Sequence, residues 1–172
     1  ARLGSGWRGR RPAAPPGGEP RGPLRASRAP GSMIAVLATN ALFQVFGQAA
    51  PFASVREALR HGKLDLAVST PILLEYEEVV LRYAGRQRWD EVGSFLTWTD
   101  VLHGTVHHLG PYYRFHTITG DADDDAFADC AIVSGADWII TSDHHFDALI
   151  GSGYKPQPIT PEEFIRQHLD RA

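Results

Sequence analysis

Cysteine is almost absent from this sequence, because Cys130 is the single one among 172 residues. One cysteine cannot form an intramolecular disulfide framework or a zinc site built from cysteines. Long hydrophobic runs are missing too, and no apolar stretch approaches the roughly 20 residues that a transmembrane helix needs. Residues 1–32 also lack the apolar segment of a secretory signal. We therefore expect a cytoplasmic protein without membrane partners, in which Cys130 is a buried thiol.

Basic residues are scarce outside the first 32 positions. Residues 1–32 hold seven arginines and one acid, Glu19, whereas the rest of the chain carries ten Lys and Arg against nineteen Asp and Glu. This excess of acid argues against nonspecific nucleic-acid binding driven by overall charge. A phosphodiester substrate would need metal ions and a local basic patch, for which the candidates are Arg82, Arg86, Arg88 and Arg114.

The first 32 residues are rich in Gly, Pro, Ala and Arg and contain almost no aliphatic side chains. Such a segment cannot bury enough apolar surface to fold, so we predict a disordered basic tail over residues 1–32. Gly31-Ser32 before Met33 indicates either a remnant of an expression vector or an upstream extension of the true start. A nucleic-acid-binding arm is a weaker alternative. The apolar content of residues 33–172 predicts one folded domain.

Apolar runs alternate with helical patterns along residues 33–172, which is typical of an α/β fold with a mostly parallel central sheet. Continuous apolar runs predict buried strands, and apolar periodicity behind capping residues predicts helices. The predicted strands are residues 33–37, 64–68 and 138–141, and the predicted helices are residues 41–48, 52–61, 72–84, 88–98, 126–133 and 161–169.

Four aspartates stand within five residues before one predicted helix, in the run Asp121-Ala122-Asp123-Asp124-Asp125. Capping of the helix N-terminus explains one or two of them, because Asp accepts backbone N–H bonds there. Capping does not explain four, since adjacent carboxylates repel one another. The next strand ends on Asp143, at the edge where open α/β sheets bind ligands. Together these acids favour a site for a hard cation such as Mg²⁺ or Mn²⁺.

Glu75 is a further acid that could join this site. It lies in the second turn of the helix predicted over residues 72–84, beside the apolar cluster Ile72-Leu73-Leu74. A solvated helix face accounts well for Glu77 and Glu78, and less well for Glu75 because of that apolar cluster.

Histidines form two candidate groups, the first with His103, His107 and His108 and the second with His144 and His145. His103 and His107 have the i,i+4 spacing of helical zinc ligands, but Gly104 and the missing flanking Glu weaken that interpretation. We interpret the first group as surface residues. For the second group we favour loop residues over ligands, and its position directly after Asp143 keeps the ligand alternative open.

The order of these segments resembles the PIN-domain ribonucleases, in particular the VapC-like toxins of toxin–antitoxin systems. The resemblance covers residues 33 to about 165, and it is carried by Ala38-Thr39-Asn40, residues 73–79, residues 121–131, residues 135–143 and residues 159–164. It implies a three-layer α/β/α fold and a metal-dependent endoribonuclease.

The resemblance also implies the catalytic residues. Glu75, Asp124 and Asp143 match metal ligands, and Asp125 is an alternative to Asp124 because the acidic run leaves the register open. Supporting polar positions around the metal match Asn40, Thr141 and Ser142. The implied cofactor is Mg²⁺ or Mn²⁺, which lowers the pKa of a bound water and stabilises charge on the phosphodiester. The implied partners are an RNA substrate, an antitoxin protein and a second copy of the chain in a homodimer.

Ala38 departs from the family pattern, in which the first strand ordinarily ends in Asp-Thr-Asn and that Asp is a principal metal ligand. A methyl group cannot bind metal. Ala38 was either engineered or is natural to a degenerate member of the family, and in both cases it predicts weak metal binding and slow or absent cleavage. Two functions stay open: an impaired endoribonuclease, and a catalytically inactive PIN module that binds RNA or an antitoxin-like protein. A phosphatase with an aspartyl nucleophile is disfavoured, because Ala38 removes that nucleophile as well.

Deletion of residues 1–32 is expected to leave the thermal midpoint of the domain essentially unchanged, because this segment has too little apolar surface to pack. Thermal melts of the full chain and of residues 33–172 test the prediction. A drop of several degrees in the shorter chain would show that the tail docks on the domain.

Overall fold

The computed structural model describes residues 32–47, 52–110, 115, 117–118 and 122–170. Within these residues the centre of the fold is a five-stranded sheet with the order β3-β2-β1-β4-β5, in which all neighbouring strands are parallel. The strands are β1 (Met33–Leu37), β2 (Leu64–Ser69), β3 (Val106–Leu109), β4 (Trp138–Ile140) and β5 (Gln157–Ile159). The predicted α/β class with a parallel core is confirmed.

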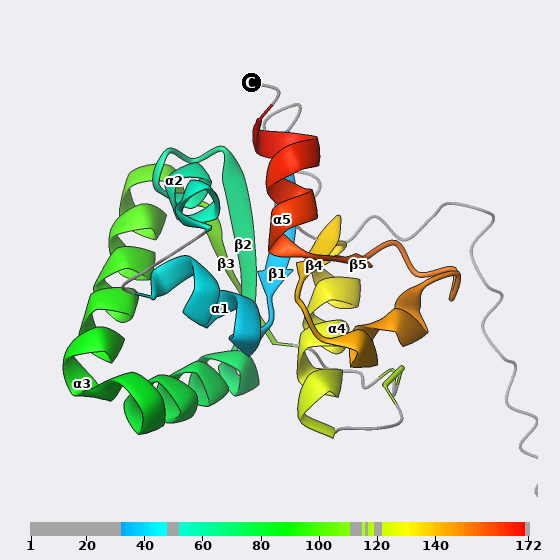
Figure 1. The fold of residues 1–172 in the computed structure, drawn as a ribbon, viewed down its shortest axis with the longest axis horizontal. Coiled ribbons are helices and arrows are strands. Elements are labelled where there is room, and N and C mark those ends of the chain that lie inside the picture. The colour runs from blue at the N-terminus through cyan, green and yellow to red at the C-terminus, as the bar shows by residue number, and fades with distance from the viewer. Residues whose placement is uncertain (1–31, 48–51, 111–114, 116, 119–121, 171–172) are drawn as a thin grey trace, which may run out of the picture.

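Helices cover both faces of this sheet and give the fold three layers. They are α1 (Thr39–Phe46), α2 (Ala53–Arg60), α3 (Thr70–His103), α4 (Ala122–Ser134), the 3₁₀ helix η1 (His144–Leu149), α5 (Pro161–Phe164) and the π-helical turn η2 (Ile165–Leu169). In Figure 1, α1, α2 and α3 lie on one side of the sheet, and α4 and η1 lie on the other. None of the helices in the described part of the chain is both long and apolar enough to cross a membrane.

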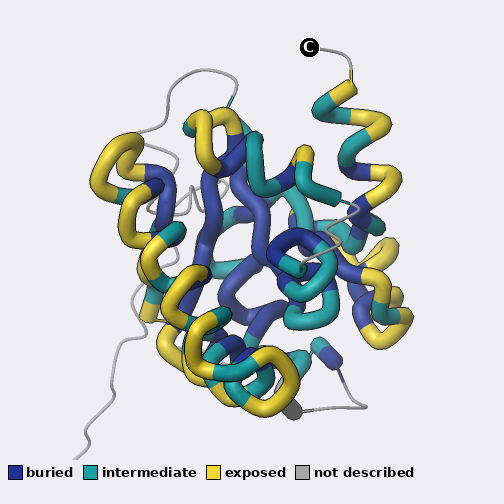
Figure 2. The backbone as a smooth tube through the Cα atoms, turned by 60° about the vertical axis from the view of Figure 1, so that its left-hand side comes forward, coloured by how far each residue is buried: buried dark blue, intermediate teal, exposed yellow. Residues whose placement is uncertain are grey.

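The central strands are the most deeply buried part of the molecule (Figure 2). Every residue of β2 is buried, and so are four of the five residues of β1. Helices on both faces exclude water from both sides of these strands. For that reason the sequences of the strands are continuous apolar runs rather than alternating apolar and polar residues. On one face, α4 contacts four of the strands, β1 to β4, and its buried side chains include Phe127, Ala128 and Cys130.

Gly135 follows the last residue of α4 and ends the helix. Its φ of 65° lies in the left-handed region that favours glycine. The Gly135 N–H donates to the Ile132 carbonyl at 3.1 Å, and the Ala136 N–H donates to the Ala131 carbonyl at 2.9 Å. This pair of bonds is a Schellman motif, which satisfies the last carbonyls of the helix. The motif turns the chain directly into β4, whose carboxyl end carries the predicted acid.

Most predicted elements are present, with differences that have physical causes. The helices predicted over residues 72–84 and 88–98 both belong to α3, which is interrupted at Gly85 by a φ of 82°. Strand β5 was not predicted, because three residues that include Pro158 give no periodic signal. The predicted tail, residues 1–32, lies outside the described residues except for Ser32.

Cys130 is a buried thiol, as expected from its place on the apolar face of α4. Its pKa is raised to about 12, mainly by burial; the neighbouring Ser69 side chain opposes the shift, and the charge of Asp129 adds to it. A thiol with so high a pKa stays protonated and is a poor nucleophile near neutral pH.

The raised pKa of Cys130 predicts a loss of stability in alkaline solution. Because its folded pKa exceeds the unfolded value of 9.0, the contribution is complete below pH 9 and is lost as pH rises from 9 towards 12. The loss is about 1.4 kcal/mol per pH unit. Urea denaturation at pH 8 and pH 10 should show a fall about 1.4 kcal/mol larger for the parent protein than for Cys130→Ala. Equal falls would contradict the assignment.

Candidate functional site

The candidate site lies where β1 and β4 end side by side. Leu37 pairs with Ile140 in the parallel register, and the Ala38 N–H continues the ladder by donating to the Ile140 carbonyl at 3.0 Å. After this point β1 leads into α1, and β4 leads through Thr141, Ser142 and Asp143 into η1. Parallel pairing therefore brings two polar segments to the same edge of the sheet, although about 100 residues separate them in the sequence.

Asn40 connects these two segments through hydrogen bonds. Its amide Nδ2 donates to Thr141 Oγ1 at 3.3 Å, and its Oδ1 accepts from the Ser142 N–H at 3.3 Å. Thr141 Oγ1 in turn accepts from the Asp143 N–H at 3.0 Å. This chain of bonds fixes the backbone that carries Asp143 relative to the start of α1.

Asp124, Asp143 and His145 form a compact group in which one ligand atom of each lies within 4.8 Å of the others. His145 Nδ1 is 3.0 Å from Asp124 Oδ2 and 3.6 Å from Asp143 Oδ1. The His145 backbone N–H also donates to Asp143 Oδ1 at 2.9 Å, so that Asp143 caps η1. The first turn of α4 and the segment after β4 thus supply two carboxylates and an imidazole that face one another.

Glu75 lies at the same edge of the sheet but outside this group of three. Its carboxylate accepts a hydrogen bond from the Thr39 hydroxyl in the first turn of α1. The next residue, Tyr76, is fully buried and donates its hydroxyl to the Leu37 carbonyl at the end of β1. Tyr76 therefore anchors α3 to the end of β1 and sets the position of Glu75.

The phenol of Tyr76 is held in its neutral form. Burial raises its pKa well above the ordinary value of 10.0, and the nearby Cys130 and Glu75 raise it further. Tyr76 therefore remains a hydrogen-bond donor to Leu37 over the whole neutral range, and the anchor of α3 does not depend on pH there.

Asp125 and Asp129 have a structural role that the sequence did not indicate. Asp125 Oδ1 accepts from the Ile118 N–H at 3.0 Å, and Asp129 Oδ1 accepts from the Phe115 N–H at 2.8 Å. Both carboxylates are buried and lie one helical turn apart on α4. They bind the backbone of the preceding segment, whereas Asp124 faces Asp143. The structure thus brings Asp124 rather than Asp125 into the group of three.

The residues present are compatible with a divalent cation. Two carboxylates from different elements converge with an imidazole nitrogen, and carboxylates that meet in this way are stabilised by a bound cation. Ala38, which is 4% exposed, begins the segment beside them and adds no donor atom. The group therefore offers three of the ligands that a cation needs, and water would complete its coordination.

A family model described as a PIN domain matches residues 35–145, which run from β1 to His145. The chain belongs to the PIN-domain family. The match extends over more than half of the chain and includes Glu75, Asp124 and Asp143. In a comparison with curated protein sequences, none matches this chain. PIN domains are generally nucleases and typically bind a divalent metal, and the acidic group of this PIN domain could hold such an ion.

His145 is the residue of the group that the sequence interpretation favoured as a loop residue. Its position two residues after a strand-ending acid was the available signal, and the structure shows that η1 turns its ring towards Asp124. His103 and His108 are exposed, as predicted, whereas the His107 side chain is only 17% exposed and its Nε2 lies 3.0 Å from Asp65 Oδ2 in the neighbouring strand. His103 ends α3 and His107 lies in β3, so they share no helix.

The arginines of the predicted basic patch are engaged with glutamates on α3. Arg82 Nη2 lies 2.5 Å from Glu78 Oε1. Arg86 Nη1 lies 3.6 Å from Glu77 Oε1. Arg88 Nη1 lies 2.6 Å from Glu91 Oε2. Arg114 lies outside the described residues. These pairs reduce the attraction that the three arginines can exert on a phosphate backbone.

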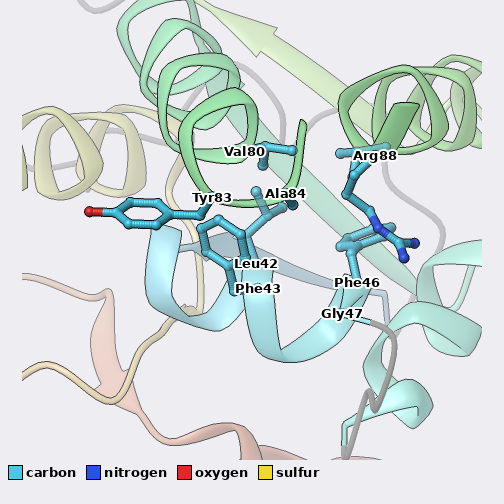
Figure 3. Close-up of a pocket in the computed structure, with 9 residues that line it drawn as sticks. Leu42, Phe43, Phe46, Gly47, Val80, Tyr83, Ala84 and Arg88 are labelled. Atoms are coloured by element: carbon cyan, nitrogen blue, oxygen red, sulfur yellow. The ribbon is translucent and has the colours of Figure 1, made fainter. Parts of the chain in front are cut away.

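An apolar cavity of about 360 Å³ lies between α1 and α3, separate from the acidic group (Figure 3). Phe43 and the exposed Tyr83 face each other at its rim with ring centroids 6.3 Å apart. Its other lining residues are Leu42, Phe46, Gly47, Val80, Ala84, Arg88 and Val92. Because the described residues that line it include no carboxylate, this cavity fits an apolar group rather than a cation.

Replacing Asp124 and Asp125 by alanine should have different consequences. Asp125→Ala leaves the Ile118 N–H without this partner and should cost about 1–3 kcal/mol of unfolding free energy. Asp124→Ala should cost less but should abolish thermal stabilisation by millimolar Mn²⁺. Urea denaturation in chelator and thermal melts with Mn²⁺ separate the two effects. Loss of the Mn²⁺ response in Asp125→Ala alone would make Asp125 the ligand.

Proposed function

We propose that this PIN domain is a metal-dependent endoribonuclease, the toxin component of a toxin–antitoxin pair, whose activity is reduced by Ala38. The observation that supports this most is the convergence of Asp124 and Asp143, from separate elements of a PIN fold, at the carboxyl edge of the sheet. Mg²⁺ or Mn²⁺ is the cofactor and RNA the substrate of this proposal.

Each polar residue at the sheet edge has a defined task in the proposed reaction. Asp124 and Asp143 would hold the cation, and Glu75, positioned by Thr39 and Tyr76, would supply negative charge at the same edge of the sheet. The bound cation would lower the pKa of a water ligand and neutralise charge on the scissile phosphodiester. Asn40 keeps Asp143 in place through Thr141 and Ser142, which preserves the geometry that such a reaction requires.

Ala38 explains why activity should be low. It is the N-cap residue of α1, with a φ of −70° and a ψ of 158°, and it makes no side-chain cap. An aspartate here would add a carboxylate at the edge shared with Asp143 and would also cap α1. Alanine offers neither the ligand nor the cap.

A second candidate function is a catalytically inactive PIN module that binds RNA or an antitoxin-like protein. Two observations favour it: Ala38 supplies no ligand, and the apolar cavity between α1 and α3 has the exposed Tyr83 at its rim. In either function we expect the protein to act in the cytoplasm. If the protein is a toxin of this kind, we also expect it to form a homodimer.

Ala38→Asp should create Mn²⁺- or Mg²⁺-dependent RNA cleavage, and Ala38→Asn is its matched control. Asn and Asp cap helices about equally well, so the two variants differ mainly in charge. In chelator, Ala38→Asp should be less stable than Ala38→Asn by about 1.4 kcal/mol or more, because the added charge lies near other acids. Mn²⁺ at about 100 times its dissociation constant should then raise its stability by about 2.7 kcal/mol.

Cleavage of RNA and thermal melts of the parent and both variants, with Mn²⁺ and with chelator, test this prediction. Asp143→Asn added to Ala38→Asp should abolish both responses. An inactive Ala38→Asp protein without metal-dependent stabilisation would support the binding-module alternative. Strong cleavage by the parent protein would show that Glu75, Asp124 and Asp143 suffice without a fourth acid.

A further inference from the structure

We propose that His145 is a direct ligand of the cation, and that the resulting nitrogen–oxygen site selects a first-row transition-metal ion over Mg²⁺. This inference rests on the proposed function, because it concerns the same site. It adds a ligand that the sequence interpretation did not favour, and it narrows the choice between Mg²⁺ and Mn²⁺. The evidence is the position of the His145 ring relative to two carboxylates from different elements.

The distances around His145 are those of ligands that share an ion. Metal–ligand bonds of about 2.1 Å place two ligand atoms about 3.0 Å apart at a right angle and about 3.4 Å apart at a tetrahedral angle. His145 Nδ1 is 3.0 Å from Asp124 Oδ2 and 3.6 Å from Asp143 Oδ1. The ligand atoms of Asp124 and Asp143 lie within 4.8 Å of each other, so rotation of the two carboxylates would bring all three groups to one ion.

The backbone around His145 is fixed by its neighbours. Asp143 Oδ1 accepts the His145 N–H, which closes a tight turn between the two residues. Phe146, the next residue, is fully buried, and its ring lies 6.4 Å from that of Phe127 on α4. This packing attaches η1 to the helix that carries Asp124. The side chain of His145 is itself 55% exposed, which leaves the site open to solvent ions and substrate.

His144 provides an internal comparison. Its side chain is 95% exposed, and its Nδ1 lies 3.4 Å from one carboxylate of its own 3₁₀ helix, Asp147. That arrangement is an ordinary surface ion pair, which contributes little to stability. His145 instead faces carboxylates from α4 and from the end of β4, so it lies at the point where the two acids converge.

Donor chemistry sets the preference among ions. Mg²⁺ favours hard oxygen ligands in octahedral geometry, whereas imidazole binds later first-row ions such as Co²⁺, Ni²⁺ and Zn²⁺ well. Affinity at a mixed nitrogen–oxygen site rises from Mn²⁺ towards those ions. Because Ala38 contributes no oxygen, the nitrogen of His145 carries a larger share of the binding energy.

The test is Mn²⁺ binding to the chain of residues 1–172, followed by pulsed electron paramagnetic resonance. A directly bound imidazole nitrogen modulates the Mn²⁺ spin echo, and this readout requires no catalysis. We expect nitrogen modulation in the parent and in His144→Ala, and none in His145→Ala. Removing a residue that only orients a metal ligand typically lowers metal affinity about 10- to 100-fold. Removing a ligand itself should lower it at least as much, so His145→Ala should bind Mn²⁺ and Co²⁺ at least about tenfold more weakly than the parent.

A third variant tests the selectivity. His145→Asp replaces nitrogen by a hard oxygen donor, so its preference for Mn²⁺ and Co²⁺ over Mg²⁺ should fall by about tenfold or more relative to the parent. Melts of every variant in chelator verify folding. Mn²⁺ binding that depends on Asp143 but shows no nitrogen modulation would overturn this inference and leave the proposed function intact. Absence of Mn²⁺ and Co²⁺ binding in both the parent and Ala38→Asp would overturn both.

Discussion

The parallel pairing of β1 with β4 is the constraint on which the candidate site depends. Leu37 lies opposite Ile140, and the Ala38 N–H extends the ladder by one bond. At the other end of the pair, the Asp137 N–H donates to the Ile34 carbonyl and the Asp137 carboxylate accepts from the Ile34 N–H. A shift of one residue in this register would separate Asn40 from Thr141 and would turn their side chains to opposite faces.

The acidic run at the start of α4 is tolerated because its described members have different partners. Asp125 binds a backbone amide, as does Asp129 further along the helix, and Asp124 faces the ring of His145. Distribution of this kind reduces the repulsion between neighbouring carboxylates without requiring that every one of them hold a metal. The same helix therefore fixes the preceding segment and contributes to the candidate cation site.

Ala38 connects the structural argument with the functional one. It occupies the position where the chain leaves the sheet, makes no side-chain cap for α1 and adds no ligand to the candidate group of two carboxylates and one imidazole. A PIN domain in this state has a nuclease fold and a partial ligand set. The proposed roles of Asp at position 38 and of His145 are complementary, since the loss of an oxygen ligand gives the nitrogen ligand greater weight in the choice of ion.

The sequence by itself determined the fold class, most elements and the edge of the sheet at which the acids gather. It could do so because buried parallel strands and capped helices leave continuous and periodic patterns, as in β1 and α4, and because parallel strands place their carboxyl ends together. It could not separate the roles of Asp124 and Asp125, since adjacent helical residues differ only in the direction of their side chains. Only the tertiary structure decided that Asp125 binds the Ile118 amide, that the His107 ring contacts the Asp65 carboxylate, and that η1 turns His145 towards Asp124. The first choice depends on the direction of one side chain on a helix, and the other two depend on segments far apart in the sequence meeting in space; no local pattern encodes either.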